Sequence, residues 1–107
     1  MVQEKSSLDN QKPWALVTGA SAGIGAEFCR QLAAAGYQLV MVARREDKLT
    51  AVADELKAQH AANSLIIAAD LSKTDASRMI VERLEQEGVE IDYLVNNAGY
   101  GIPGSFH

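Results

Sequence analysis

The feature that most constrains the fold of this chain is a glycine-spaced turn that directly follows a short apolar run. The run Trp14-Ala15-Leu16-Val17 leads into Thr18-Gly19-Ala20-Ser21-Ala22-Gly23-Ile24-Gly25. Glycines at a strand-to-helix turn let the backbone bend tightly and approach a pyrophosphate, which then faces the free N–H groups of the new helix. Glycines also mark ordinary turns, but the flanking strand and helix supply the context that a phosphate site requires. The segment therefore predicts a dinucleotide-binding turn.

The rest of the chain alternates between apolar runs and amphipathic helices. Strands are predicted at about residues 14–18, 38–43, 64–69 and 92–95, and helices at about 23–35, from 46 onward, and from 72 to 88. In the first helix Ile24, Phe28 and Leu32 are spaced four apart on one apolar face, and the third helix is expected to bury Ala76, Ile80 and Leu84. The segment Ser72-Lys73-Thr74-Asp75 has the pattern of a capping box, so the third helix is expected to open there.

Three strand–helix–strand units joined by short connections predict an α/β fold of the Rossmann type. The expected sheet is parallel, with strand order 3-2-1-4, helices on both faces, and a ligand over the carboxyl ends of the strands where the order reverses. We expect residues 13–107 to form the amino-terminal half of a dinucleotide-binding domain, truncated after its fourth strand, and residues 1–12 to form a frayed or disordered leader. The fourth strand would then be an uncovered edge.

Composition limits the function. The net charge of −4 argues against a nucleic-acid or membrane-surface partner. No apolar run approaches the roughly 20 residues that span a bilayer, and the first ten residues hold no apolar segment of signal-peptide length, so a cytoplasmic protein is expected. The single cysteine, Cys29, excludes an internal disulfide and a cysteine-built metal site. It is expected to be a packed small residue of the first helix.

The segment Ala43-Arg44-Arg45 at the end of the second strand bears on cofactor choice. Dinucleotide folds that prefer NAD place an acid near this position to hold the ribose hydroxyls. Here no carboxylate would repel a phosphate, and two guanidinium groups can pair with one. We expect NADP(H) preference, with Arg44 the main contact and Arg45 auxiliary. The alternative is that both arginines are solvated side chains at the start of the second helix.

The spacing Gly-x-x-x-Gly-x-Gly, with its leading Thr-Gly, resembles the short-chain dehydrogenase/reductase family. Two further segments resemble the same family. Asp70 matches the aspartate whose carboxylate faces the adenine amino group, and Asn96-Asn97-Ala98-Gly99 matches the signature that passes close to the adenosine ribose. The resemblance covers about residues 12–104. It implies that NADP(H) is bound by Gly19, Ser21, Ala22, Gly23, Ile24, Gly25, Arg44, Arg45, Asp70, Leu71, Asn96, Ala98 and Gly99.

The same resemblance implies an oxidoreductase that moves a hydride between nicotinamide and a small carbonyl or alcohol substrate, as a homo-oligomer when full length. The family's active site uses a Tyr-x-x-x-Lys pair, and here the positions four after Tyr37, Tyr93 and Tyr100 hold Met, Asn and Gly. No catalytic residue is therefore assigned, and the 107-residue chain is expected to be inactive by itself. The alternatives are a non-catalytic NADP-binding or interaction module, and a truncated product without independent activity.

Overall fold

The fold is given by a computed structural model that describes residues 12–98. Residues 1–11 of the predicted leader (residues 1–12) and the predicted site residue Gly99 lie outside the described residues. In chain order the elements are β1 (Trp14–Thr18), α2 (Gly23–Ala34), β2 (Gln38–Ala43), α3 (Glu46–His60), β3 (Ser64–Ala68), α4 (Ala76–Glu87) and β4 (Tyr93–Asn96). No helix among the described residues is both long and apolar enough to cross a membrane.

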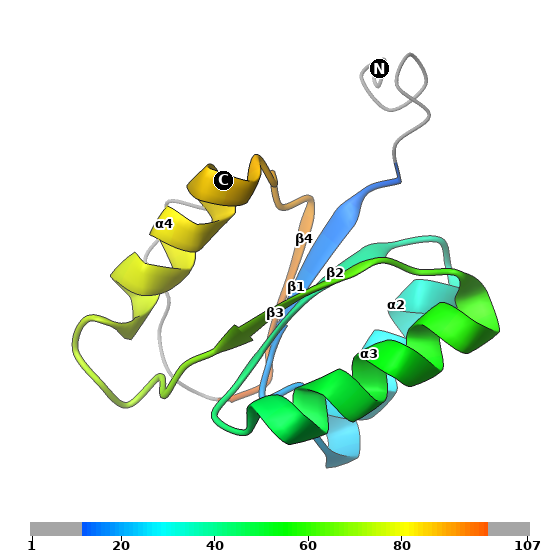
Figure 1. Ribbon diagram of the computed structural model, residues 1–107, viewed down its shortest axis with the longest axis horizontal. Coiled ribbons are helices and arrows are strands. Elements are labelled where there is room, and N and C mark those ends of the chain that lie inside the picture. Colours follow the sequence, from blue (N-terminus) through cyan, green and yellow to red (C-terminus); the bar gives the residue numbers. More distant parts are fainter. Residues whose placement is uncertain (1–11, 99–107) are drawn as a thin grey trace.

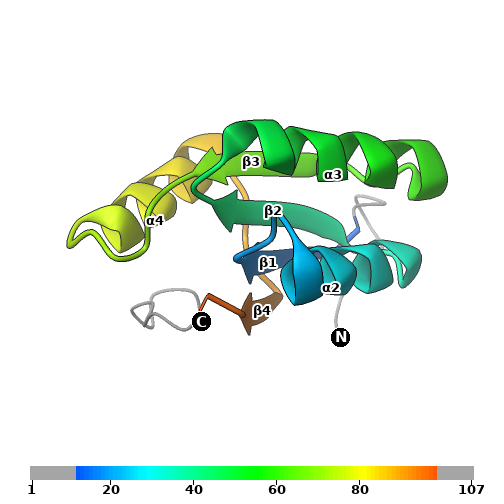
Figure 2. The same ribbon diagram turned by 90° about the horizontal axis from the view of Figure 1, so that it is seen from below.

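The four strands form one parallel sheet in the order β3-β2-β1-β4 (Figure 2). β1 is central: Leu16 lies opposite Val40 of β2 on one side and opposite Leu94 of β4 on the other. All three strand pairs are parallel, because each connection carries a helix back across the sheet. The predicted fold class and strand order are confirmed.

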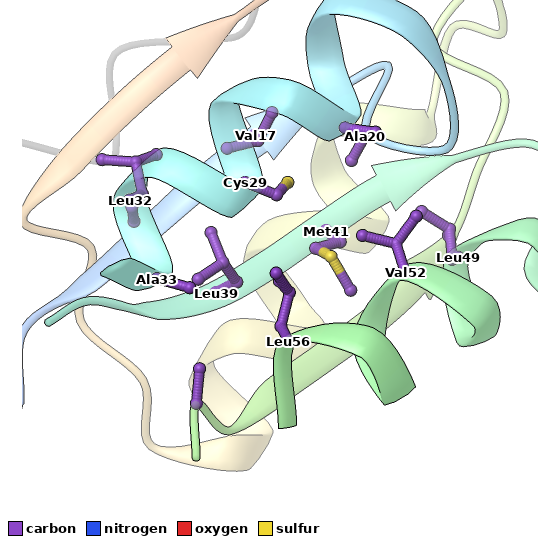
Figure 3. Packing of buried hydrophobic residues seen from close by; sticks show 13 residues of the cluster. Val17, Ala20, Cys29, Leu32, Ala33, Leu39, Met41, Leu49, Val52 and Leu56 are labelled. Carbon is purple, nitrogen blue, oxygen red and sulfur yellow. The ribbon is translucent and has the colours of Figure 1, made fainter. Parts of the chain in front are cut away.

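Helices cover both faces of the sheet, as predicted. α2 and α3 lie on one face and α4 lies on the other (Figures 1 and 2). Successive side chains of each strand point alternately to the two faces of the sheet. The α2 and α3 side is lined by the alternating strand residues Ala15, Val17, Leu39 and Met41, with Cys29, Leu49 and Leu56 from the helices (Figure 3). The α4 side is lined by Leu16, Val40, Val42, Ile67, Ile80 and Leu84.

The apolar face predicted for α2 is only partly buried. Leu32 is buried, but Ile24 is 70% exposed and Phe28 is 39% exposed. The helix instead packs through small residues: Ala26 is buried in the same cluster, and so are Cys29 and Ala33 (Figure 3). Small side chains on the buried face allow the helix backbone to lie close to the strands. The larger Ile24 and Phe28 lie outside this face.

Cys29 is fully buried, and desolvation raises the pKa of its thiol to about 12. A thiol with so high a pKa carries almost no thiolate at neutral pH, so it is a poor nucleophile. The prediction of a packed small residue is confirmed.

The predicted capping box is wrong. The backbone N–H and the hydroxyl of Ser72 both donate to the Asp70 carboxylate, at 3.0 and 2.6 Å, so Ser72 closes a turn after β3 instead of capping a helix. α4 begins only at Ala76, after Asp75, whose side chain makes no capping hydrogen bond. The rest of the helix follows the prediction, with Ala76, Ile80 and Leu84 buried and Gly88 at its end.

Candidate functional site

The carboxyl ends of three adjacent strands are held side by side by backbone hydrogen bonds that extend beyond the strands themselves. The N–H of Ala20, after β1, donates to the carbonyl of Val42 in β2 at 3.2 Å. The N–H of Ala69, after β3, donates to the carbonyl of Ala43 at 2.9 Å. The glycine turn, the end of β2 and the start of the β3–α4 connection therefore meet at one edge of the sheet.

The glycine turn has a backbone conformation that other residues would adopt only with strain. Gly19 and Gly23 have φ of 64° and 61°, in the left-handed region that L-residues disfavour. Gly25 is restricted in a different way, because a Cβ there would overlap the carbonyl oxygen of Gly19. The first turn of α2 thus packs directly on the backbone of the turn that precedes it.

A buried threonine ties this turn to the end of β4. The hydroxyl of Thr18 donates to Oδ1 of Asn96 at 3.1 Å and accepts the N–H of Ala98 at 3.0 Å. The side-chain amide of Asn97 donates to the carbonyl of Gly19 at 3.3 Å. Thr18 is fully buried, so both bonds are partly shielded from solvent. In the sequence, Thr18 is notable only as the leading residue of the Thr-Gly pair, and its contacts with β4 were not predicted.

These strand ends enclose a pocket of about 350 Å³. Seven predicted site residues line it: Gly19, Ser21, Arg44, Arg45, Asp70, Leu71 and Ala98. The other four lining residues, which are not among the predicted site residues, are Val42, Ala43, Ala69 and Ser72.

Five of the predicted residues do not line this pocket. Ala22 precedes α2, and Gly23, Ile24 and Gly25 form its first residues. Asn96 closes β4 and contacts Thr18. These residues border the glycine turn on the side of α2 and β4, while the pocket extends across β2 toward the β3–α4 connection.

The charged side chains on the pocket wall differ in whether they have a partner of opposite charge. The Arg44 side chain is exposed and forms no ion pair within residues 12–98. Arg45 donates through Nε and Nη2 to the Asp47 carboxylate, at 3.2 and 3.1 Å. Across the pocket, the hydrogen bonds from Ser72 lower the pKa of Asp70, and the charges of Arg44 and Lys73 lower it further. The pocket therefore presents a cation at the end of β2 and an ionised carboxylate after β3.

Among the described residues, no group of three or more His, Cys, Asp or Glu side chains is arranged to hold a metal ion. The polar groups that line the pocket are guanidinium groups, hydroxyls, a carboxylate and backbone atoms. This set of groups suits a phosphorylated organic ligand: a guanidinium pairs with a phosphate, a carboxylate accepts from an amino group, and the partly buried Leu71 can contact a flat ring.

Comparisons with known proteins agree with a site for a phosphorylated organic ligand. The family model described as short chain dehydrogenase matches residues 13–107. The chain belongs to the short chain dehydrogenase family. Among curated relatives, a very-long-chain 3-oxoacyl-CoA reductase from Aspergillus clavatus is 38% identical over 95 residues, covering 87% of this chain and 28% of the relative.

Solved structures of short chain dehydrogenases share the fold. L-sorbose reductase from Gluconobacter frateurii, complexed with NADPH and L-sorbose, superposes with a TM-score of 0.77 at 34% identity, covering 85% of this chain and 35% of that one. A short-chain dehydrogenase from Sphingobium yanoikuyae in complex with NADPH gives a TM-score of 0.73 at 37% identity, covering 81% and 34%. The chain thus spans about a third of the length of these relatives.

Proposed function

We propose that this chain is the NADP(H)-binding, amino-terminal part of an oxidoreductase that transfers a hydride between nicotinamide and a carbonyl or alcohol substrate. Residues 13–107 would form the first half of its dinucleotide-binding domain. The family membership of the chain supports the class of reaction, and the pocket at the strand ends supports the cofactor.

The observation that carries the proposal is the position of Arg44. It follows β2 directly, lines the pocket, and forms no ion pair among the described residues. The side chain at the end of β2 is Ala43, so no carboxylate stands where one would hold the ribose hydroxyls of NAD. A guanidinium free to pair with a phosphate at this position favours a ribose that carries a 2′-phosphate.

The remaining pocket groups fit the other parts of a dinucleotide. The left-handed backbone at Gly19 and the absence of a side chain at Gly25 keep the turn open to a pyrophosphate. The carboxylate of Asp70 is ionised and would accept from an adenine amino group, with Leu71 beside the ring. NADPH is also the ligand in the two related structures described above.

The catalytic step belongs to the proposal for the whole protein. The bound nicotinamide would supply or accept the hydride, while the residues of this chain would bind and orient the adenosine and pyrophosphate end. The sequence holds no Tyr-x-x-x-Lys pair, so we assign no general acid or base to any residue of this chain.

Isothermal titration of a protein containing this sequence with NADP⁺ and with NAD⁺ tests the proposal. NADP⁺ should bind roughly ten- to a hundred-fold more tightly, the range expected for charged hydrogen bonds to one phosphate. Adenosine 2′,5′-bisphosphate, which carries the 2′-phosphate without the nicotinamide, should compete with NADP⁺. Equal affinities for NADP⁺ and NAD⁺ would refute the assigned cofactor.

A further inference from the structure

The two adjacent arginines at the end of β2 are in different electrostatic states. Both line the pocket, but only Arg45 is paired, with two of its N–H groups on the carboxylate of Asp47. Asp47 itself does not line the pocket. One guanidinium is therefore paired with a carboxylate from outside the pocket, and the other has no ion-pair partner among the described residues.

The backbone explains how residues two apart can pair. Positions i and i+2 of a helix do not face each other. Arg45, however, is the residue before α3 and has extended backbone, with φ −101° and ψ 101°, so its side chain can turn back to Asp47 in the first helical turn. A cation at the positive end of a helix is unfavourable, and the carboxylate of Asp47 offsets this. The pairing also lowers the pKa of Asp47, with the Arg45 hydrogen bond as the largest cause.

We propose that Asp47 is a positioning residue that sets how strongly this pocket prefers a 2′-phosphate, by holding Arg45 in an ion pair and leaving Arg44 as the cation that meets the phosphate. This inference rests on the proposed NADP(H) function and deepens it. In this arrangement two N–H groups of Arg45 are engaged by Asp47, and the nearby carboxylate opposes the attraction of Arg45 for a phosphate.

Removing the carboxylate should release a second guanidinium for the phosphate. Asp47→Asn should tighten NADP⁺ about two- to five-fold, the scale of an exposed ion pair, and leave NAD⁺ unchanged. Glu46→Gln is the matched control, because it removes the same charge one position earlier in the same helical turn. The Glu46 side chain forms no ion pair within residues 12–98.

Titration calorimetry of the protein with NADP⁺ and NAD⁺ should be run on four forms: unsubstituted, Asp47→Asn, Glu46→Gln, and Asp47→Asn in an Arg45→Ala background. The inference predicts that the ratio of NADP⁺ to NAD⁺ affinity rises in Asp47→Asn more than in Glu46→Gln, and that the gain disappears when Arg45 is absent. The gain should also shrink as salt is raised, because it depends on an exposed charge.

Three results would overturn the inference: equal effects of Asp47→Asn and Glu46→Gln, a gain that persists in the Arg45→Ala background, or weaker NADP⁺ binding by Asp47→Asn. The proposed function fails by a different result. If the unsubstituted protein showed no preference for NADP⁺ over NAD⁺, the assigned cofactor would be wrong and the inference would fall with it.

Discussion

Gly23 and Gly25 are two residues apart after the glycine turn, and each position disfavours a side chain for a different physical reason. At Gly23 the backbone is left-handed while the space around a Cβ is open. At Gly25 a Cβ would overlap the Gly19 carbonyl oxygen, so any side chain must displace the turn itself. The first restriction concerns backbone energy, and the second concerns the shape of the binding turn.

Alanine at these two positions should therefore give different results. Gly23→Ala should destabilise the fold by about 1–2 kcal/mol, the cost of a left-handed L-residue. Gly25→Ala should weaken NADP⁺ binding by roughly tenfold or more, because the Gly19 backbone must move. Urea unfolding and titration calorimetry on both variants separate the effects. Unchanged NADP⁺ affinity in Gly25→Ala would show that the turn has room the structure does not show.

The sequence could predict residues that follow apolar strands as site residues, but not the side-chain contacts around them. Arg44 and Asp70 come directly after apolar strands, and parallel topology brings such positions together, so both were predicted to share one site. The contacts of Thr18 join residues about 80 positions apart. The pair of Arg45 with Asp47 depends on one extended residue before a helix. Neither leaves a periodic pattern in the sequence.

At the scale of elements, periodicity predicted the buried face of α4 better than that of α2. The buried residues of α4 are Ala76, Ile80 and Leu84, spaced four apart as the sequence indicated. In α2 the same spacing selected Ile24 and Phe28, which are 70% and 39% exposed. The periodic pattern was read from the large apolar side chains, whereas the buried face of this helix consists mainly of alanines and a cysteine. Likewise, the capping motif before α4 failed because the carboxylate of Asp70 competes for Ser72.

Two neighbouring residues of α4 test the packing of that helix. Ile80 is fully buried on the sheet, while Met79 is 47% exposed. Ile80→Ala should lower the free energy of unfolding by about 2–5 kcal/mol, through lost burial and the cavity left behind. Met79→Ala should cost about 1 kcal/mol or less. Equal losses in urea denaturation would mean that α4 does not dock on the sheet through the face that carries Ile80.

At the scale of the whole molecule, the described sheet has β4 at one edge, with Tyr93 51% exposed and Leu94 39% exposed. Ile24 and Phe28 add exposed apolar surface on α2. An apolar strand at a sheet edge offers backbone donors and acceptors to another chain.

We expect the 107-residue polypeptide, prepared by itself, to self-associate and to show no NADPH-dependent carbonyl reduction. Light scattering over a concentration series and nicotinamide absorbance check the two halves of this expectation. Leu94→Lys should reduce the association, because a charge on an edge strand opposes pairing. A monomer at every concentration would contradict the first half, and measurable turnover would contradict the second.

The most direct test of NADP(H) binding by this chain is the affinity of Arg44→Ala for the two cofactors. The substitution removes the guanidinium that lines the pocket without an ion pair among the described residues, while Ala43 and the glycine turn stay in place. In a protein containing this sequence, NADP⁺ binding should weaken by about 1.5–3 kcal/mol, roughly ten- to a hundred-fold, and NAD⁺ binding should change little. Equal losses for NADP⁺ and NAD⁺ would show that Arg44 does not contact a 2′-phosphate and would contradict the account.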